Sequence, residues 1–154
     1  MDTSARTHLI IGWLDSQRYA LRLAVVERIV RAVEVTPLPR APEIVQGVVD
    51  MEGVVIAVVN IRRRLGLPER PITPNDRFMV VWTQQRRVIV VLDAVQEILE
   101  ISMEQIMTAA QILPHTQYVE GVVKLPDGLI FIHDLGQFLS LDEEQTLSHA
   151  LVNA

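Results

Sequence analysis

Hydrophobic and polar residues alternate along this chain in a pattern that is used twice. The stretch from Ile44 to Leu67 predicts a strand, a tight turn, a second strand and a helical turn. The same pattern returns from Gln117 to Leu141, where an offset of 74 residues places Gly121 on Gly47. The second strand of each copy is almost free of polar residues. Such strands are typically buried on both faces or closed into a barrel.

The repeat extends upstream of this unit. An offset of 69 residues places Trp82 on Trp13 and Val95 on Val26, and both segments predict hairpins with polar turns. The two pseudo-repeats span residues of about 8–67 and 78–141. Internal duplication is the simplest explanation. We therefore expect residues 1–154 to form a single all-β domain made of two β-barrel subdomains.

A few short helices should punctuate the strands. Asn60 to Leu65 predicts a helix with an asparagine cap and a glycine after its end. After Val25 the pattern predicts a bend and then a strand, and Ser102 to Gln105 has the spacing of a capping box. Residues 142–154 form a polar tail in which Leu147 and Leu151 are four residues apart, which predicts a C-terminal helix with one apolar stripe.

Composition removes several functional classes. The chain has 154 residues, 49% of them hydrophobic, but no apolar run of about 18 residues that could span a membrane. It begins without the pattern of a signal peptide and contains no cysteine, which is consistent with a cytoplasmic protein. The net charge is −5, and the only basic cluster is Arg62 to Arg64. We therefore expect no nucleic-acid partner and no membrane insertion.

No arrangement of residues predicts catalysis. The four histidines lack the spacing of a metal site, and no nucleophile has a neighbouring base, so we expect no enzyme activity, no metal and no cofactor. His133, at the end of an apolar strand, should be a structural histidine. Trp13 and Trp82 should pack in the core. Arg62 to Arg64 follow a buried strand, where they form either a solvated helix face or an interface.

Several of these features follow one another in a recognisable order: Pro42, Gly47 to Gly53, the apolar run Val54 to Val59, and Asn60 to Gly66. In this order they resemble the motif of the CheW-like adaptor domains of bacterial chemotaxis. The resemblance covers the chain from about His8 to Ser140. It implies a fold of two interlocked five-stranded SH3-like β-barrels, which agrees with the duplication.

The resemblance also implies a function. Members of this family are non-catalytic scaffolds that couple the cytoplasmic tip of a methyl-accepting chemoreceptor to the regulatory domain of a CheA-type histidine kinase. The protein could belong either to the main chemotaxis array or to an accessory signalling cluster; the resemblance implies neither in particular. By this resemblance, the residues that would bind partners are Val26, Arg28, Glu52, Gly53 and Arg62. The alternative is a regulatory domain that senses a small molecule bound between the two barrels.

The sequence departs from the family motif at two charged positions. An arginine is usual where Glu52 stands, and an acidic residue is usual where Arg28 stands. Two opposite changes of charge suggest one exchanged ion pair. We therefore expect Arg28 and Glu52 to face each other at or near the receptor-binding surface. Asn60 replaces the usual aspartate, and either residue can cap a helix.

Overall fold

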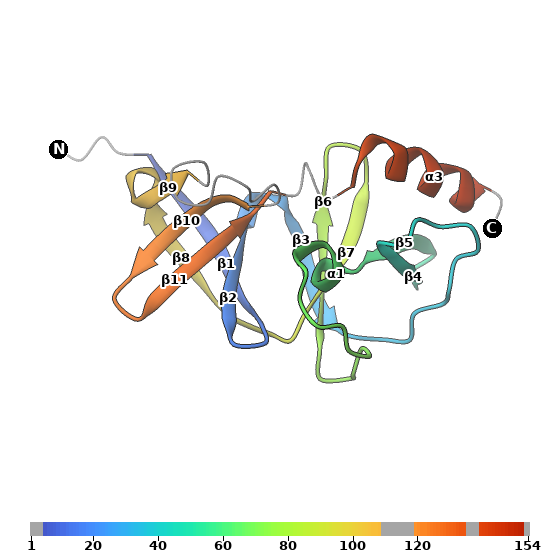
Figure 1. Cartoon of the computed structure of the whole chain (residues 1–154), viewed down its shortest axis with the longest axis horizontal. Coiled ribbons are helices and arrows are strands. Elements are labelled where there is room, and N and C mark those ends of the chain that lie inside the picture. The colour runs from blue at the N-terminus through green and yellow to red at the C-terminus, as the bar shows by residue number, and fades with distance from the viewer. Residues whose placement is uncertain (1–4, 109–118, 135–138, 153–154) are drawn as a thin grey trace.

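The computed structural model describes residues 5–108, 119–134 and 139–152. Its strands form two sheets that lie next to each other, with one longer helix near the C-terminus (Figure 1). In chain order the elements are β1 (Arg6–Leu14), β2 (Gln17–Arg22), η1 (Leu23–Val25), β3 (Val26–Arg31), β4 (Val45–Met51), β5 (Val54–Val59), α1 (Ile61–Leu65), β6 (Arg77–Trp82), β7 (Arg87–Leu92), β8 (Ala94–Ser102), η2 (Met103–Gln105), β9 (Ile106–Thr108), β10 (Val119–Leu125), β11 (Gly128–His133) and α3 (Leu141–Val152).

The two halves of the chain exchange their hairpins. The first sheet has the strand order β8-β1-β2-β11-β10-β9, so the N-terminal hairpin pairs only with strands from the second half. The second sheet has the order β3-β6-β7-β5-β4, in which the hairpin β6–β7 pairs with strands from the first half. Each sheet therefore needs both halves of the chain. This exchange is the interlocked arrangement that the family resemblance implies.

The strand registers follow the duplication. β5 runs parallel to β7 with Ala57 opposite Val88, and β11 runs parallel to β2 with Phe131 opposite Tyr19. The offsets of 74 and 69 residues found in the sequence convert one pair into the other. The described residues therefore follow one plan in both sheets, with the same pairing at equivalent positions.

Gly47 and Gly121 occupy equivalent positions, as predicted. Each follows a β-bulge, in β4 and β10 respectively. A Cβ atom on Gly47 would lie 2.3 Å from the carbonyl oxygen of Thr36, and one on Gly121 would lie 2.9 Å from that of Met107. The backbones approach too closely at both positions for any side chain.

In each sheet, the chain bends from one edge strand towards the strand at the other edge. The first sheet begins with β8 and ends with β9, and η2 joins these two strands directly. In the second sheet, the chain beyond β3 reaches β4 through a bridge of two hydrogen bonds between Thr36 and Val48, 2.8 and 2.9 Å long. The first sheet has six strands instead of the expected five because η2 divides its bent segment into two.

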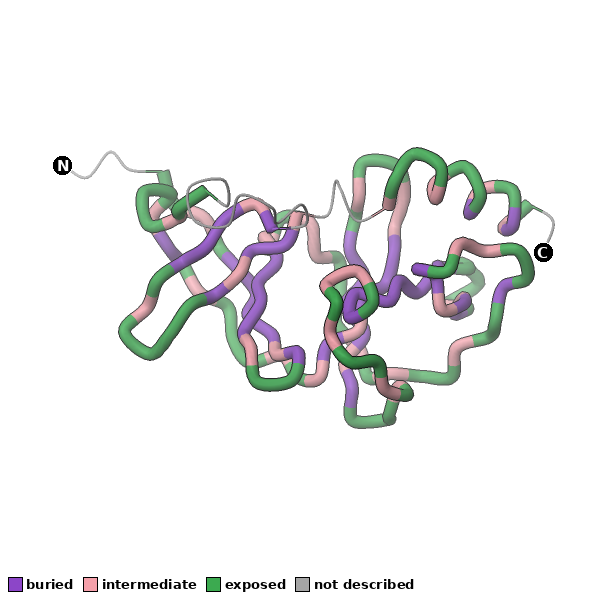
Figure 2. Tube along the Cα trace, in the orientation of Figure 1, coloured by how far each residue is buried: buried purple, intermediate pink, exposed green. Residues whose placement is uncertain are grey.

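Buried residues lie along the strands of both sheets (Figure 2), and those of the described ranges form four clusters, the smallest of which contains Val119 and Val122. One cluster lies within the first sheet and includes Leu9 and Ile130, and another lies within the second sheet and includes Phe78 and Val80. The largest cluster contains residues of both sheets and of α3. Since successive residues of β6 point to opposite faces, the complete burial of Phe78 to Val81 shows that both faces of this strand are covered.

The short helices agree with the sequence signals. Asn60 caps α1 by accepting a hydrogen bond from the Arg63 N–H at 3.1 Å, and Gly66 ends the helix with φ 73°. Ser102 and Gln105 form the predicted capping box of η2. α3 buries Leu147 and Ala150 in the large core cluster. The helical turn expected after β11 lies outside the described residues.

Candidate functional site

The turn between β4 and β5 presents Glu52 and Gly53 to solvent. Met51 lies opposite Val54 in the register, so these two residues alone make the turn. Both have left-handed backbones, with φ 55° for Glu52 and 86° for Gly53. The Asp50 carboxylate accepts a hydrogen bond from the Gly53 N–H at 2.9 Å. This is the geometry of a tight hairpin turn, and it projects Glu52 away from the sheet.

Arg28 on β3 faces Glu52. The Arg28 Nη1 atom lies 3.4 Å from the Glu52 Oε1 atom, and the two side chains are 41% and 77% exposed. The predicted pairing of these residues is therefore confirmed. An exposed ion pair contributes only about 0 to 1 kcal/mol to folding. Most of the Glu52 carboxylate remains available to another molecule.

The two other residues expected at this surface differ in exposure. Val26 is half-buried and packs against the large core cluster, two residues before Arg28 on the same strand. Gly53 is exposed, and no atom lies within 4 Å of the place where its Cβ would be. The contact of Arg28 with Glu52 places β3 beside the turn that holds Gly53, whereas Val26 packs towards the core.

Arg62, the fifth expected residue, does not face solvent, and this expectation is corrected. Only 8% of it is exposed. Its guanidinium donates to both oxygens of Asp93 at 2.7 and 2.8 Å and to the Pro68 carbonyl at 2.9 Å, and it lies 2.9 Å from the Asp15 carboxylate. The sequence suggested that Arg62 lies either on a solvated helix face or in a protein interface. Neither describes Arg62, because acceptors within the protein bind its guanidinium.

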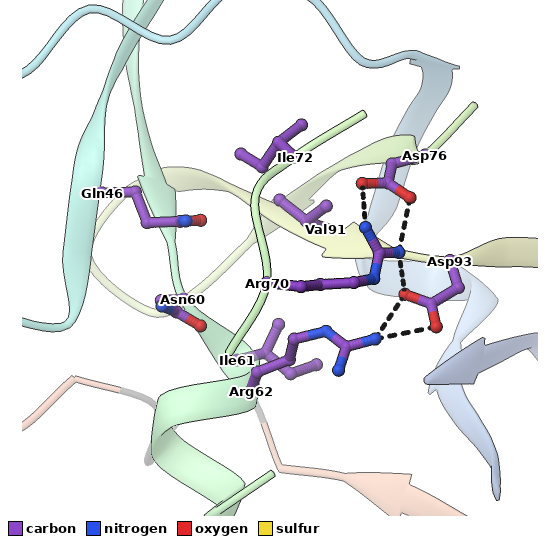
Figure 3. A pocket seen from close by; sticks show the side chains of 9 residues that line it. All are labelled: Gln46, Asn60, Ile61, Arg62, Arg70, Ile72, Asp76, Val91 and Asp93. Carbon is purple, nitrogen blue, oxygen red and sulfur yellow. Dashed lines mark hydrogen bonds and ion pairs between the residues drawn. The ribbon is translucent and has the colours of Figure 1, made fainter. Parts of the chain in front are cut away.

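The acceptors of Arg62 belong to a larger ion network (Figure 3). Arg70 donates to Asp93 at 2.6 Å and to both oxygens of Asp76 at 2.7 and 3.0 Å. Burial raises the pKa of Asp93, but hydrogen bonds from Arg62, the Asp15 N–H and Arg70 outweigh it and leave this pKa below its ordinary value. Asp93 therefore stays ionised between two guanidinium groups.

This network joins the two sheets. Asp15 lies in the turn between β1 and β2 of the first sheet, whereas Arg62 is the second residue of α1, which follows β5 of the second. Asp93 lies between β7 and β8, where the chain crosses from one sheet to the other. Removing one member of a buried ion pair typically costs about 3–5 kcal/mol. The sequence contains a weak signal for the burial of Arg62, because only Asn60 and Ile61 separate it from the apolar strand that ends at Val59.

The space around the network is small. The cavity lined by Arg62, Arg70, Asp76 and Asp93 has a volume of about 20 Å³. This volume is close to that needed for one water molecule. Within the described ranges, no three histidine, aspartate or glutamate side chains are grouped so that they could hold a metal ion. None of the described helices combines the length and the apolar character needed to cross a membrane.

His133 has the environment of a structural residue, as expected. Its ring stacks on Tyr19, with 4.8 Å between the ring centroids. Burial lowers the pKa of His133 to about 3, so its imidazole is neutral at physiological pH. Burial also raises the pKa of Tyr19.

Trp82 is exposed more than the sequence predicts. Half of it is accessible to solvent, whereas the equivalent Trp13 is partly buried. The expectation that both tryptophans pack in the core is therefore wrong for Trp82. The contacts of the two residues differ: the Trp13 indole donates to Gln96, whereas the equivalent residue Glu27 pairs with Arg87 and leaves Trp82 without that contact.

Known proteins provide an independent comparison. The family model described as the CheW-like domain matches residues 10–143. The chain is similar to the chemotaxis protein CheW of Treponema pallidum, with 22% identity over 92% of this chain and 86% of that protein, and to the chemotaxis protein CheW of Rhizobium meliloti, with 26% identity over 93% and 94%.

A solved structure has the same fold. The scaffolding protein TtCheW of Thermoanaerobacter tengcongensis superposes with a TM-score of 0.80, covering 90% of this chain and 96% of that one, at 24% sequence identity. At this identity the likeness concerns the fold. Because the family model spans most of the sequence, the chain belongs to the CheW-like domain family.

Proposed function

We propose that this protein is a non-catalytic, cytoplasmic adaptor that couples the tip of a methyl-accepting chemoreceptor to the regulatory domain of a CheA-type histidine kinase. The observation that carries the proposal is the family match over residues 10–143, together with relatives named as chemotaxis proteins and a scaffolding protein of the same fold. A scaffold needs binding surfaces and a rigid frame, and the network that joins the two sheets supports such a frame.

Exposed apolar residues support protein binding. Ile29 on β3 and Ile98 on β8 are equivalent in the repeat and are 38% and 57% exposed. Their neighbours on the adjacent strands, Met79 and Ile10, lie in the large core cluster. Each isoleucine therefore extends the apolar surface of the central core outward. Exposed apolar surface of this kind is typical of interfaces with another protein.

The exchanged ion pair supports selectivity for the receptor. We propose that Val26, Arg28, Glu52 and Gly53 contact the receptor, and that Arg62 acts indirectly by fixing α1 against the first sheet. Glu52, 77% exposed at its side chain, favours a basic group on the partner and repels an acidic one. Such a pair affects the choice of partner more than the stability of the fold.

Charge reversal tests this role. Glu52→Arg should weaken binding to the cognate receptor fragment, and the double variant Arg28→Glu with Glu52→Arg should recover part of it or redirect binding to receptors of the usual charge pattern. Melting temperatures should stay close to that of the unchanged protein, because the pair is exposed. Unchanged receptor affinity in Glu52→Arg would remove the role in partner choice.

The rival function, binding of a small molecule between the barrels, has two possible places: the cavity beside Arg62 and a groove of about 340 Å³ beside Trp82. The large core cluster fills the space between the sheets, and the cavity beside Arg62 has only about 20 Å³. Small-molecule sites usually have volumes of about 300–1,000 Å³. The cavity beside Arg62 is too small for such a ligand, and the groove beside Trp82 is large enough but carries no further sign of a small-molecule site. The family match favours the adaptor, so we propose the adaptor as the function.

A further inference from the structure

The indole N–H of Trp82 has no acceptor within the described part of the chain. At the equivalent position, the Trp13 indole donates to the Gln96 side chain at 2.9 Å. The residue that corresponds to Gln96 by the offset of 69 is Glu27, but its carboxylate pairs with Arg87 at 3.2 Å. Trp82 thus offers solvent a hydrogen-bond donor as well as an aromatic surface. Tryptophan residues of this kind are enriched in the centres of protein interfaces.

Trp82 lines a groove between the two sheets. The groove has a volume of about 340 Å³ and lies between the end of β6 and the first sheet. Val25 gives it a second apolar wall, and the buried His133 also borders it. This volume accommodates a large side chain with its flanking backbone. It is the place where an exposed tryptophan and a concave surface coincide.

The charges that line this groove are unbalanced. Arg22 and Glu120 form an ion pair and are 32% and 29% exposed at their side chains, and Asp134 adds a second carboxylate. His133 contributes no charge because its burial keeps the ring neutral. One cation and two anions give the groove a formal charge of −1, which favours a cationic ligand group.

The chain itself shows that these tryptophans accept guanidinium groups. Arg18 lies 5.9 Å from the ring centroid of Trp13, and Arg87 lies 5.4 Å from that of Trp82. Half of Trp82 remains accessible with Arg87 in this position. Guanidinium groups near an indole within about 6 Å gain cation–π attraction, and they also donate to carboxylates.

We propose that this groove binds an arginine side chain from a segment of a partner protein. The guanidinium would contact the exposed part of the Trp82 ring and donate to Glu120, and a backbone carbonyl of the same segment would accept from the Trp82 indole N–H. The groove adjoins the proposed receptor contact, because Val25 precedes Val26 and Trp82 follows Val81, the register partner of Val26, but its lining includes neither Arg28 nor Glu52.

The two tryptophans permit a test with an internal control. In a ¹H–¹⁵N spectrum of the full chain, Trp82 and Trp13 each give one indole cross-peak. Titration with the blocked tripeptide acetyl-Gly-Arg-Gly-amide should shift the Trp82 peak to saturation while the Trp13 peak, whose N–H is bonded to Gln96, stays in place. The corresponding Glu and Leu tripeptides should produce at most a third of that shift at the same concentration.

Two substitutions in one ion pair give opposite expected effects. Arg22→Gln changes the groove charge from −1 to −2 and should tighten binding of the arginine tripeptide by about threefold, whereas Glu120→Gln brings it to 0 and should weaken binding by about threefold. Both substitutions break the same ion pair. If they acted only by damaging the local structure, both variants would therefore change affinity in the same direction. Trp82→Ala, measured by calorimetry, should abolish binding.

Several results would overturn the proposal. These are the absence of a saturable Trp82 shift, equal shifts of both indole peaks, and binding of the Leu or Glu tripeptide as tight as that of the Arg tripeptide. Affinity changes of the same sign in Arg22→Gln and Glu120→Gln would also overturn it, as would retained binding in Trp82→Ala.

Discussion

The end of the first sheet that carries Trp13 and the end of the second sheet that carries Trp82 have equivalent registers but different surfaces. Beside Trp13, Arg18 is buried and donates to both oxygens of Asp127 at 3.0 and 3.2 Å. Beside Trp82, the position that corresponds to Asp127 is Gly53, and the chain leaves half of the indole exposed.

The comparison shows how a duplicated fold can acquire a binding surface. The strand registers, the bulges and the close glycine contacts are the same in both halves, because the backbone pairing depends on them. Side chains at the turns are free to change without altering that pairing. One end can therefore stay covered by its own ion pair while the other end becomes available to a partner.

The largest loss of stability is expected at the two equivalent glycines, Gly47 and Gly121. Gly47→Ala and Gly121→Ala should each destabilise the protein by about 3 kcal/mol, because a Cβ would lie 2.3 Å from the Thr36 oxygen or 2.9 Å from the Met107 oxygen. Gly53→Ala is the control: its Cβ meets open space, and its φ of 86° costs about 1 kcal/mol. Urea denaturation measures all three. A small loss in either Gly47→Ala or Gly121→Ala would break the equivalence of the halves.

The next largest effect is a difference in stability between the variants Trp13→Ala and Trp82→Ala. Trp13→Ala removes partly buried surface and the hydrogen bond to Gln96, so we expect a loss of about 2 kcal/mol. Trp82→Ala removes a half-exposed side chain and should cost less than about 1 kcal/mol. Chemical denaturation of both variants decides this difference. Equal losses would mean that Trp82 is as well packed as Trp13.

Their arginine neighbours should show a smaller difference. Arg18→Ala should cost about 1.5 kcal/mol because the stem of Arg18 is buried, whereas Arg87→Ala removes a partly exposed side chain and should cost less than half as much. The same denaturation assay compares them. A larger loss of stability in Arg87→Ala than in Arg18→Ala would mean that the end with Trp82, and not the end with Trp13, is the better packed one.

The smallest effect is a dependence on acid. Hydrogen bonding from Arg18 lowers the pKa of Asp127. The contribution of this contact to stability is therefore complete above the ordinary carboxyl pKa of about 3.9 and is lost as the pH falls through the lower pKa of the folded state. Carboxyl NMR titration should show the Asp127 pKa returning to its ordinary value in Arg18→Ala and not in Arg87→Ala. An unchanged Asp127 pKa in Arg18→Ala would contradict the contact.

The sequence predicts local features and misses those that depend on distant partners. The duplication, the equivalence of Gly47 with Gly121 and the cap at Asn60 follow from periodicity and turn chemistry, which are properties of neighbouring residues. The exchange of hairpins came from the family resemblance, because periodicity identifies a strand but not its partner. The charge pattern together with the family motif predicted the contact between Arg28 and Glu52.

The predictions for Arg62 and Trp82 are wrong for physical reasons. Arg62 was interpreted as exposed, but its acceptors Asp15 and Asp93 lie far from it in the sequence, and no local pattern reveals them. Trp82 was placed in the core because it aligns with Trp13. The two positions differ in a contact to another strand, since the Trp13 indole donates to Gln96 whereas the equivalent Glu27 pairs with Arg87.

Co-sedimentation tests whether this chain couples a receptor to a kinase, as proposed. Receptor fragments assembled on vesicles, a CheA-type kinase and this protein should sediment together, and the kinase should remain in the supernatant when this protein is left out. Arg62→Ala, which disrupts the joint between the sheets, should reduce the kinase in the pellet, while Leu141→Ala at an exposed position of α3 should not. Equal sedimentation of the kinase with and without the protein would contradict the adaptor function.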